Sequence, residues 1–315
     1  MQDIDLTGPD GTTASILDWG ATLRDLVVPL ADGTRRRVVL GYQRPQDYRA
    51  NPAYLGAIVG RHANRIAGGR FALDGRSHQL TLNEDGRTHL HGGSVGFSHQ
   101  PWRIAGRTAA SVTLALTSPD GDQGYPGTVN ATCTYTLAAP ATLVVELSAT
   151  TDAPTPVNLA HHSYFTLAEG ADARAHSLQL GAARYTPVDA GQIPTGDIAA
   201  VAGTPFDFRA GRIIDLPLDH NFVLTGDRPA AVVTAPDGRL QLTVTTDAPG
   251  LQVYDGRGLR ALGPGIGGQA HFPYAGLALE PQHFPDSPNH PGFPDVILRP
   301  GRTWRQRSAF RFAAP

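Results

Sequence analysis

The 315-residue sequence contains no lysine, and all 26 of its basic Lys and Arg positions are arginine. A chain without lysine cannot form a Schiff base with a carbonyl substrate, hold pyridoxal phosphate as an internal aldimine, or complete a Walker A loop. The single cysteine, Cys133, excludes an internal disulfide framework and a cysteine-based structural zinc site. These absences remove several large enzyme classes at once.

Charge of one sign and long apolar runs are also lacking. The formal net charge is −2 at pH 7, which gives no electrostatic footprint for nucleic acid or an anionic membrane. No apolar run approaches the roughly 18 residues of a membrane-spanning helix. Residues 1–11 lack the apolar region of a signal peptide. We therefore expect a cytoplasmic protein that binds neither nucleic acid nor membrane.

Alternation of apolar and polar residues is the dominant pattern. Apolar side chains recur at every second position in residues 112–116 and 240–244, as in a β-strand with one buried face. Asp-Gly pairs, which favour tight turns, stand at 32–33, 74–75, 85–86, 120–121 and 237–238. Long amphipathic helical patterns are hard to find. We predict one all-β domain over residues 1–315, a large β-sandwich or barrel with few short helices.

Two glycine-rich segments match patterns of other enzyme classes. Residues 263–268 fit the G-x-G-x-x-G pattern of dinucleotide-binding folds, which needs a strand before it and a helix after it. The following residues, 269–273, contain a proline and cannot start a regular helix, so a loop is the better interpretation. Residues 92–96 fit G-x-S-x-G, but no helical pattern follows them. A serine hydrolase centred on Ser94 remains as an alternative.

Twelve histidines invite a metal-site interpretation. However, the sequence has no H-E-x-x-H motif and no close Cys/His set. His161 and His162 are adjacent, and neighbours on a strand point to opposite faces, so they are poorly placed to share one ion. We predict no metal site and no cofactor.

Four segments place polar groups where a β domain would otherwise place core residues. They are residues 60–75, 83–102, 158–165 and 279–289. Within them, Arg65, His91, His162 and Glu280 together supply two imidazoles, a carboxylate and a guanidinium, and several aromatic rings accompany them. This set suits sugar chemistry, because acid and base groups can act on a hydroxyl and an ether oxygen while rings cover the apolar face of the sugar.

These segments are similar to those of the aldose 1-epimerase, or galactose mutarotase, family, and the similarity runs from one end of the chain to the other. Further motifs of the family stand at 19–23, 38–42, 124–127, 193–196, 206–208, 219–224 and 298–301. The resemblance implies a β-supersandwich of the galactose mutarotase type. It also implies an isomerase that interconverts the α and β anomers of a free aldose, such as glucose or galactose, without a cofactor.

The resemblance also assigns roles to individual residues. Glu280 matches the general base of the family, His162 its general acid and His91 its second active-site histidine. The substrate-binding positions of the family correspond to Arg65, Asn64, Asp219 and Gln252. The chemistry agrees, because opening a pyranose removes a proton from the C1 hydroxyl and delivers one to the ring oxygen. An imidazole near its reference pKa of about 6.5 can act both ways, and burial would strengthen a glutamate as a base.

Other interpretations stay open beside the epimerase. A catalytically silent sugar-binding domain of the same fold is disfavoured because binding alone needs neither Glu280 nor His162. An enzyme for hexose 6-phosphates would need a cationic phosphate pocket. The sequence departs from the family pattern at His161, where asparagine is common, and in the glycine-rich loop 255–274. We expect a monosaccharide as the partner, and a monomer or homodimer.

Overall fold

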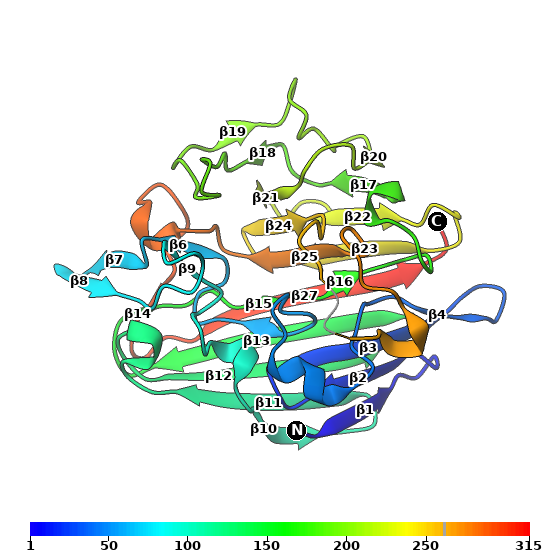
Figure 1. Cartoon of the computed structure of the whole chain (residues 1–315), viewed down its shortest axis with the longest axis horizontal. Helices are drawn as coiled ribbons and strands as arrows, with labels where there is room; N and C mark the ends of the chain where they lie inside the picture. The colour runs from blue at the N-terminus through cyan, green and yellow to red at the C-terminus, as the bar shows by residue number, and fades with distance from the viewer. Residues whose placement is uncertain (261–262) are drawn as a thin grey trace.

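The computed structural model describes residues 1–260 and 263–315, and its regular structure is mostly β-strand (Figure 1). The helices of this part of the chain are short 3-10 elements. They are η1 (Pro45–Arg49), η2 (Phe97–His99), η3 (Asp122–Gly124), η4 (Ala173–Ala175), η5 (Ile266–Gly268) and η6 (Ser287–Asn289). The prediction of an all-β chain with few short helices is confirmed. None of the described helices is long and apolar enough to cross a membrane.

A nine-stranded antiparallel sheet forms the larger layer of the molecule and extends from the bottom of Figure 1 to its upper right. In order across the sheet, its strands are β10 (Arg103–Arg107), β11 (Ser111–Ser118), β12 (Val129–Ala138), β13 (Thr142–Thr151), β27 (Trp304–Ala313), β23 (Gln241–Thr246), β22 (Ala231–Thr234), β17 (Ser177–Leu180) and β20 (Arg212–Ile213). The two alternating runs of the sequence lie in or next to β11 and β23. Their apolar side chains are buried on the inner face, as the period of two predicts.

A six-stranded antiparallel sheet forms the second layer, in the middle and upper part of Figure 1. Its order is β16 (Tyr164–Phe165), β25 (Leu277–Gln282), β24 (Gly250–Tyr254), β21 (Asp219–Val223), β18 (Arg184–Tyr185) and β19 (Ala199–Ala200). Leu251 and Leu279 of this sheet belong to the same buried cluster as Tyr135 and Phe310 of the larger sheet. The two layers therefore share one hydrophobic core, which makes the fold a β-sandwich.

Shorter strands complete the chain around these layers. A four-stranded sheet contains β1 (Asp3–Thr7), β2 (Thr13–Leu17), β3 (Thr22–Pro29) and β4 (Arg35–Arg37). Four two-stranded ladders pair β5 (Ile58–Val59) with β15 (Ala160–His161), β6 (Arg65–Ala67) with β9 (Thr88–Leu90), β7 (Arg70–Leu73) with β8 (Arg76–Gln79), and β14 (Thr155–Pro156) with β26 (Ile297–Leu298). The β6–β9 ladder sets Arg65 opposite Leu90, so it brings segments 60–66 and 88–91 together.

The six-stranded sheet has one apolar and one polar face, and the polar face positions the site. On β25, Leu279 points into the core, so Glu280 must point to the other side. Glu280 lies in register with Gln252 on β24, and Asp219 on β21 lies in register with Tyr254. Three adjacent strands thus present polar side chains to one face.

Candidate active site

A pocket of about 260 Å³ opens over this polar face. It collects side chains from stretches that are far apart in the sequence. Its polar and aromatic lining includes Tyr54, Asn64, Arg65, His91, His162, Tyr164, Asp219, Tyr254, Arg257 and Glu280. Six of the seven site residues that the sequence suggested therefore line one cavity, and Gln252 is not among the lining residues. The assignment of roles to them stays a proposal.

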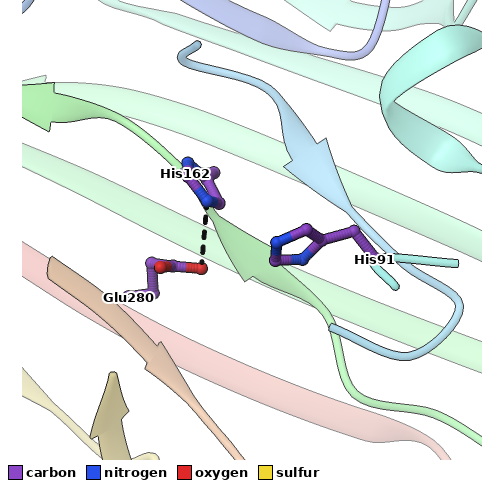
Figure 2. Close-up of side chains that lie close together, drawn as sticks. All are labelled: His91, His162 and Glu280. Atoms are coloured by element: carbon purple, nitrogen blue, oxygen red, sulfur yellow. Dashed lines mark ion pairs between the residues drawn. The ribbon is translucent and has the colours of Figure 1, made fainter. Parts of the chain in front are cut away.

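Glu280 and His162, which both line this pocket, face each other (Figure 2). The Nε2 atom of His162 lies 3.6 Å from Oε2 of Glu280, and the two residues are 4% and 2% exposed. Oε2 of Glu280 has no hydrogen-bond partner among the described residues. A buried polar atom without a partner is costly in a folded protein, so this carboxylate is available to a ligand.

Burial moves the pKa values of these two groups toward each other. Desolvation, with the nearby charge of Asp219, raises the pKa of Glu280 well above its usual value. Desolvation lowers the pKa of His162 to about 4, below the reference value assumed from the sequence. From the sequence, the pKa of the glutamate would rise only if the residue is buried, which the structure shows, whereas a lowered pKa of the imidazole was not expected.

His91 approaches the pair from the β9 side, with its ring centroid 5.1 Å from that of His162 (Figure 2). Its Nδ1 accepts a hydrogen bond of 3.1 Å from the backbone N–H of Asn64. Burial holds the pKa of His91 well below its usual value, so the ring is neutral. A neutral imidazole that accepts at Nδ1 carries its proton at Nε2. His91 is therefore a hydrogen-bond donor toward the pocket, held in that tautomer by Asn64.

His91, His162 and Glu280 also bring one potential metal-ligand atom each within 4.8 Å of one another. Two histidines and a glutamate are the donor set of some catalytic zinc sites. Nδ1 of His91 is occupied by the Asn64 N–H, however, and Nε2 carries the proton, so neither nitrogen offers a free lone pair. The hydrogen bonding of His91 does not fit a metal ligand, and the expectation of no metal stays a prediction.

Arg65 is held at the edge of the pocket by a carboxylate that the sequence analysis did not select. Its Nε and Nη2 donate to the two carboxylate oxygens of Glu84, each at 2.8 Å. The remaining Nη1 lies 3.6 Å from Oδ2 of Asp219. Thr88 donates a further hydrogen bond to Glu84. The guanidinium is thus fixed on one side and leaves one nitrogen directed toward Asp219.

Gln252 lies behind Asp219. Its Nε2 donates to Oδ1 of Asp219 at 2.7 Å, and it is 3% exposed. This contact occupies one carboxylate oxygen and leaves Oδ2 between Arg65 and Arg257, each 3.6 Å away. In the structure, Gln252 therefore contacts Asp219, and its assignment as a substrate-binding residue stays a prediction.

The other sequence-based assignments can also be placed. The ring of His161 packs between Tyr135 and Phe310 in the core, with centroid distances of 5.8 and 5.6 Å, so it points away from His162 as strand alternation predicted. Ser94 lies on an exposed turn, and the helix that follows this turn, η2, has only three residues. That geometry is not the strand–turn–helix of a nucleophile elbow. Residues 263–268 contain a bridge at Gly265 and η5, without a long helix.

Three contributors to the site were missed from the sequence, namely Tyr54, Glu84 and Arg257. The ring centroid of Tyr54 lies 4.6 Å from that of His91. Glu84 directly follows Asn83 and lies within the segment 83–102, but it was not singled out as a candidate residue. Arg257 stands between two glycines in the loop that departs from the family pattern. A charged residue in a glycine-flanked turn at the end of a site strand was the available signal for it.

Comparison with known proteins agrees with the family resemblance of the sequence motifs. A model of the family described as aldose 1-epimerase matches residues 2–311. The aldose 1-epimerase of Escherichia coli (strain K12) is 41% identical, over 96% of this chain and 93% of that protein. The galactose mutarotase of Homo sapiens is 39% identical, over 95% of this chain and 90% of that protein.

Solved structures with a similar fold include the following two. An aldose epimerase homologue from C. elegans superposes with a TM-score of 0.94 at 32% identity, over 99% of both chains. A galactose 1-epimerase from Lactobacillus acidophilus NCFM superposes with a TM-score of 0.86 at 32% identity, over 98% of this chain and 93% of that one.

Proposed function

The chain belongs to the aldose 1-epimerase family, and we propose that it interconverts the α and β anomers of free aldoses with Glu280 as general base and His162 as general acid. The observation that carries the assignment is the buried pair itself. A carboxylate and an imidazole lie 3.6 Å apart in the lining of a pocket of about 260 Å³, which is suited to one monosaccharide.

The reaction needs two proton transfers on one sugar. Glu280 removes the proton from the C1 hydroxyl while His162 delivers a proton to the ring oxygen, and the bond between C1 and that oxygen breaks. The open-chain aldehyde then rotates about its C1–C2 bond. Closure on the other face of the aldehyde reverses both transfers. His91, a neutral donor at Nε2, hydrogen-bonds to oxygen atoms of the sugar.

The perturbed pKa values give this mechanism a physical basis. Two titrating groups 3.6 Å apart act as a pair, and the working pair holds one proton. Ring opening moves that proton from His162 to Glu280 through the sugar, and closure moves it back. In water, the proton would strongly prefer the imidazole. Burial raises the pKa of Glu280 and lowers that of His162, so it offsets this preference. The two proton affinities become more similar, and the proton can move in both directions.

The charges of the pocket support a neutral sugar over a hexose 6-phosphate. Among the described lining residues the arginines are Arg65 and Arg257. Arg65 is paired with Glu84 and approaches Asp219. Arg257 lies 3.6 Å from Asp219 and 3.8 Å from Asp255. Each guanidinium therefore already has carboxylate neighbours, which leaves no uncompensated cation for a phosphate.

The direct test is polarimetry on freshly dissolved α-D-glucose and α-D-galactose, with and without protein, in dilute buffer. The protein should speed relaxation to the same final rotation. Glu280→Gln should remove the acceleration, and Ser94→Ala should keep it, because Ser94 lies on an exposed turn away from the pocket lining. Sugar binding without acceleration of glucose, galactose or pentoses would instead indicate the silent sugar-binding domain. Activity should survive exhaustive chelation.

Three sequence-based expectations remain proposals beside this one. The buried cluster that runs from Ile4 to Phe312 supports a single domain over residues 1–315. A cytoplasmic location and a monomeric or homodimeric state are predicted from the sequence.

A further inference from the structure

Arg257 is a lining residue of the pocket that stands outside the predicted set of site residues. It belongs to the turn that follows β24, and its side chain is 34% exposed. Its Nη1 donates to the backbone carbonyl of Leu218 at 3.2 Å, and its Nη2 lies 3.6 Å from Oδ2 of Asp219. The second distance is too long for a direct hydrogen bond. Nη2 can therefore donate a hydrogen bond to a ligand between or beside these atoms, and Oδ2 can accept one.

The turn that carries Arg257 is built into the sheet. The carboxylate of Asp255, fully buried, accepts hydrogen bonds from the backbone N–H groups of Leu218 and Arg257. The hydroxyl of Tyr254 accepts one from the N–H of Gly258. Gly256 has φ of +73°, and a Cβ there would lie 2.3 Å from a backbone oxygen. These contacts fix the position of the Arg257 backbone relative to β21 and β24.

The register of the sheet places Arg257 away from the reacting end of the pocket. Gln252 faces Glu280, and Tyr254, two residues further along β24, faces Asp219. Two strand residues span roughly 7 Å. Arg257 follows Tyr254 in the chain, so it lies beyond that row, on the side away from Glu280. In a pyranose, the C3–C4 bond lies across the ring from the bond between C1 and the ring oxygen.

From this geometry we propose that Arg257 is a specificity-determining residue that donates a hydrogen bond to the hydroxyl on C4 of the sugar. The inference rests on the proposed function, because Glu280 and His162 fix where C1 and the ring oxygen sit. C4 is the ring atom farthest from C1, and it is the carbon at which glucose and galactose differ. Oδ2 of Asp219, the neighbouring acceptor, accepts a hydrogen bond from the sugar hydroxyl adjacent to the one on C4. Arg257 thereby contributes to the choice between C4 epimers.

The experiment compares Arg257→Gln and Arg257→Lys with the wild type on α-D-glucose, α-D-galactose and 4-deoxyglucose. Arg87→Gln serves as the matched control, because Arg87 is exposed and does not line the pocket. Initial rates are followed by polarimetry, and thermal unfolding checks that each variant is folded. For Arg257→Gln we expect KM for glucose and galactose to rise about tenfold or more, by unequal factors, with kcat largely kept.

The deoxy sugar makes the assignment specific. Because 4-deoxyglucose lacks the hydroxyl in question, its KM should be nearly the same for the wild type and Arg257→Gln, and Arg257→Lys should recover part of the loss on the full sugars. Equal rises in KM for glucose and 4-deoxyglucose, an unchanged KM, or a fall in kcat alone would overturn the inference. A wild-type protein that accelerates no mutarotation would instead refute the proposed function, so the two failures are distinguishable.

Discussion

The ion pair between Arg65 and Glu84 gives a sharp test of how the substrate edge of the pocket is held. Glu84 accepts from Nε and Nη2 of Arg65 at 2.8 Å each, and Thr88 donates to the same carboxylate. Partial burial alone would raise the pKa of Glu84, but the hydrogen bonds from Arg65 and Thr88 hold it below its usual value. The group is therefore ionised at neutral pH and receives the fork of the guanidinium.

Glu84→Gln should weaken substrate binding while the chemical step stays largely intact. A glutamine offers one carbonyl oxygen to the fork, and its NH₂ group meets an N–H donor of Arg65. One charge-assisted hydrogen bond, worth about 1.5–3 kcal/mol, is lost. At about 1.4 kcal/mol per tenfold, KM should rise roughly 10- to 100-fold. The expected kcat is close to that of the wild type, because Glu84 is not among the pocket-lining residues.

The assay is polarimetry over a range of α-D-glucose concentrations, with Glu146→Gln as the matched control. Glu146 lies on β13, its side chain is 53% exposed, and it is paired with Arg307 on the neighbouring strand. The double variant Arg65→Gln/Glu84→Gln should be no worse than Arg65→Gln alone, since Glu84 acts through Arg65. Unchanged kinetics of Glu84→Gln, or losses that simply add in the double variant, would refute this reasoning.

Four further predictions concern the catalytic pair and the buried histidines. Glu280→Gln should lower kcat by at least about 10²-fold, and near-wild-type turnover would remove the base assignment. The wild-type rate should show a bell-shaped pH dependence, falling on the acid side through the pKa of about 4 of His162 and on the alkaline side through the raised pKa of Glu280. His162→Asn should reduce kcat much more than it changes sugar affinity, measured by calorimetric titration, and the opposite result would make His162 a binding residue. Buried histidines with folded-state pKa values of about 3 to 4 take up protons more readily when unfolded, so stability is full above pH about 6.5 and is lost as the pH falls toward 4. Each of these buried histidines lowers the free energy of unfolding by up to about 1.4 kcal/mol per pH unit over this range. Equal midpoints of urea unfolding at pH 7 and pH 5 would contradict this prediction. These histidines are His62, His89, His161, His162 and His283.

The all-β class followed from local patterns because the side-chain period of a strand is independent of the rest of the chain. The alternation at 112–116 and 240–244 sufficed to predict β11 and β23, and the buried faces came out as expected. Strand alternation also separated His161 from His162 correctly. The candidate residues for acid–base chemistry came from residue type and from the ordered motifs of the family.

The tertiary structure decided which of those residues meet and in what state. Glu280 and His162 are 118 positions apart, and pairing of distant strands brings them within 3.6 Å, which no local pattern encodes. Their burial sets the direction of both pKa shifts, because desolvation depends on the packed surroundings. The same holds for Gln252 against Asp219, for Glu84 against Arg65, and for Arg257, whose turn becomes part of the pocket only when β24 pairs with β21.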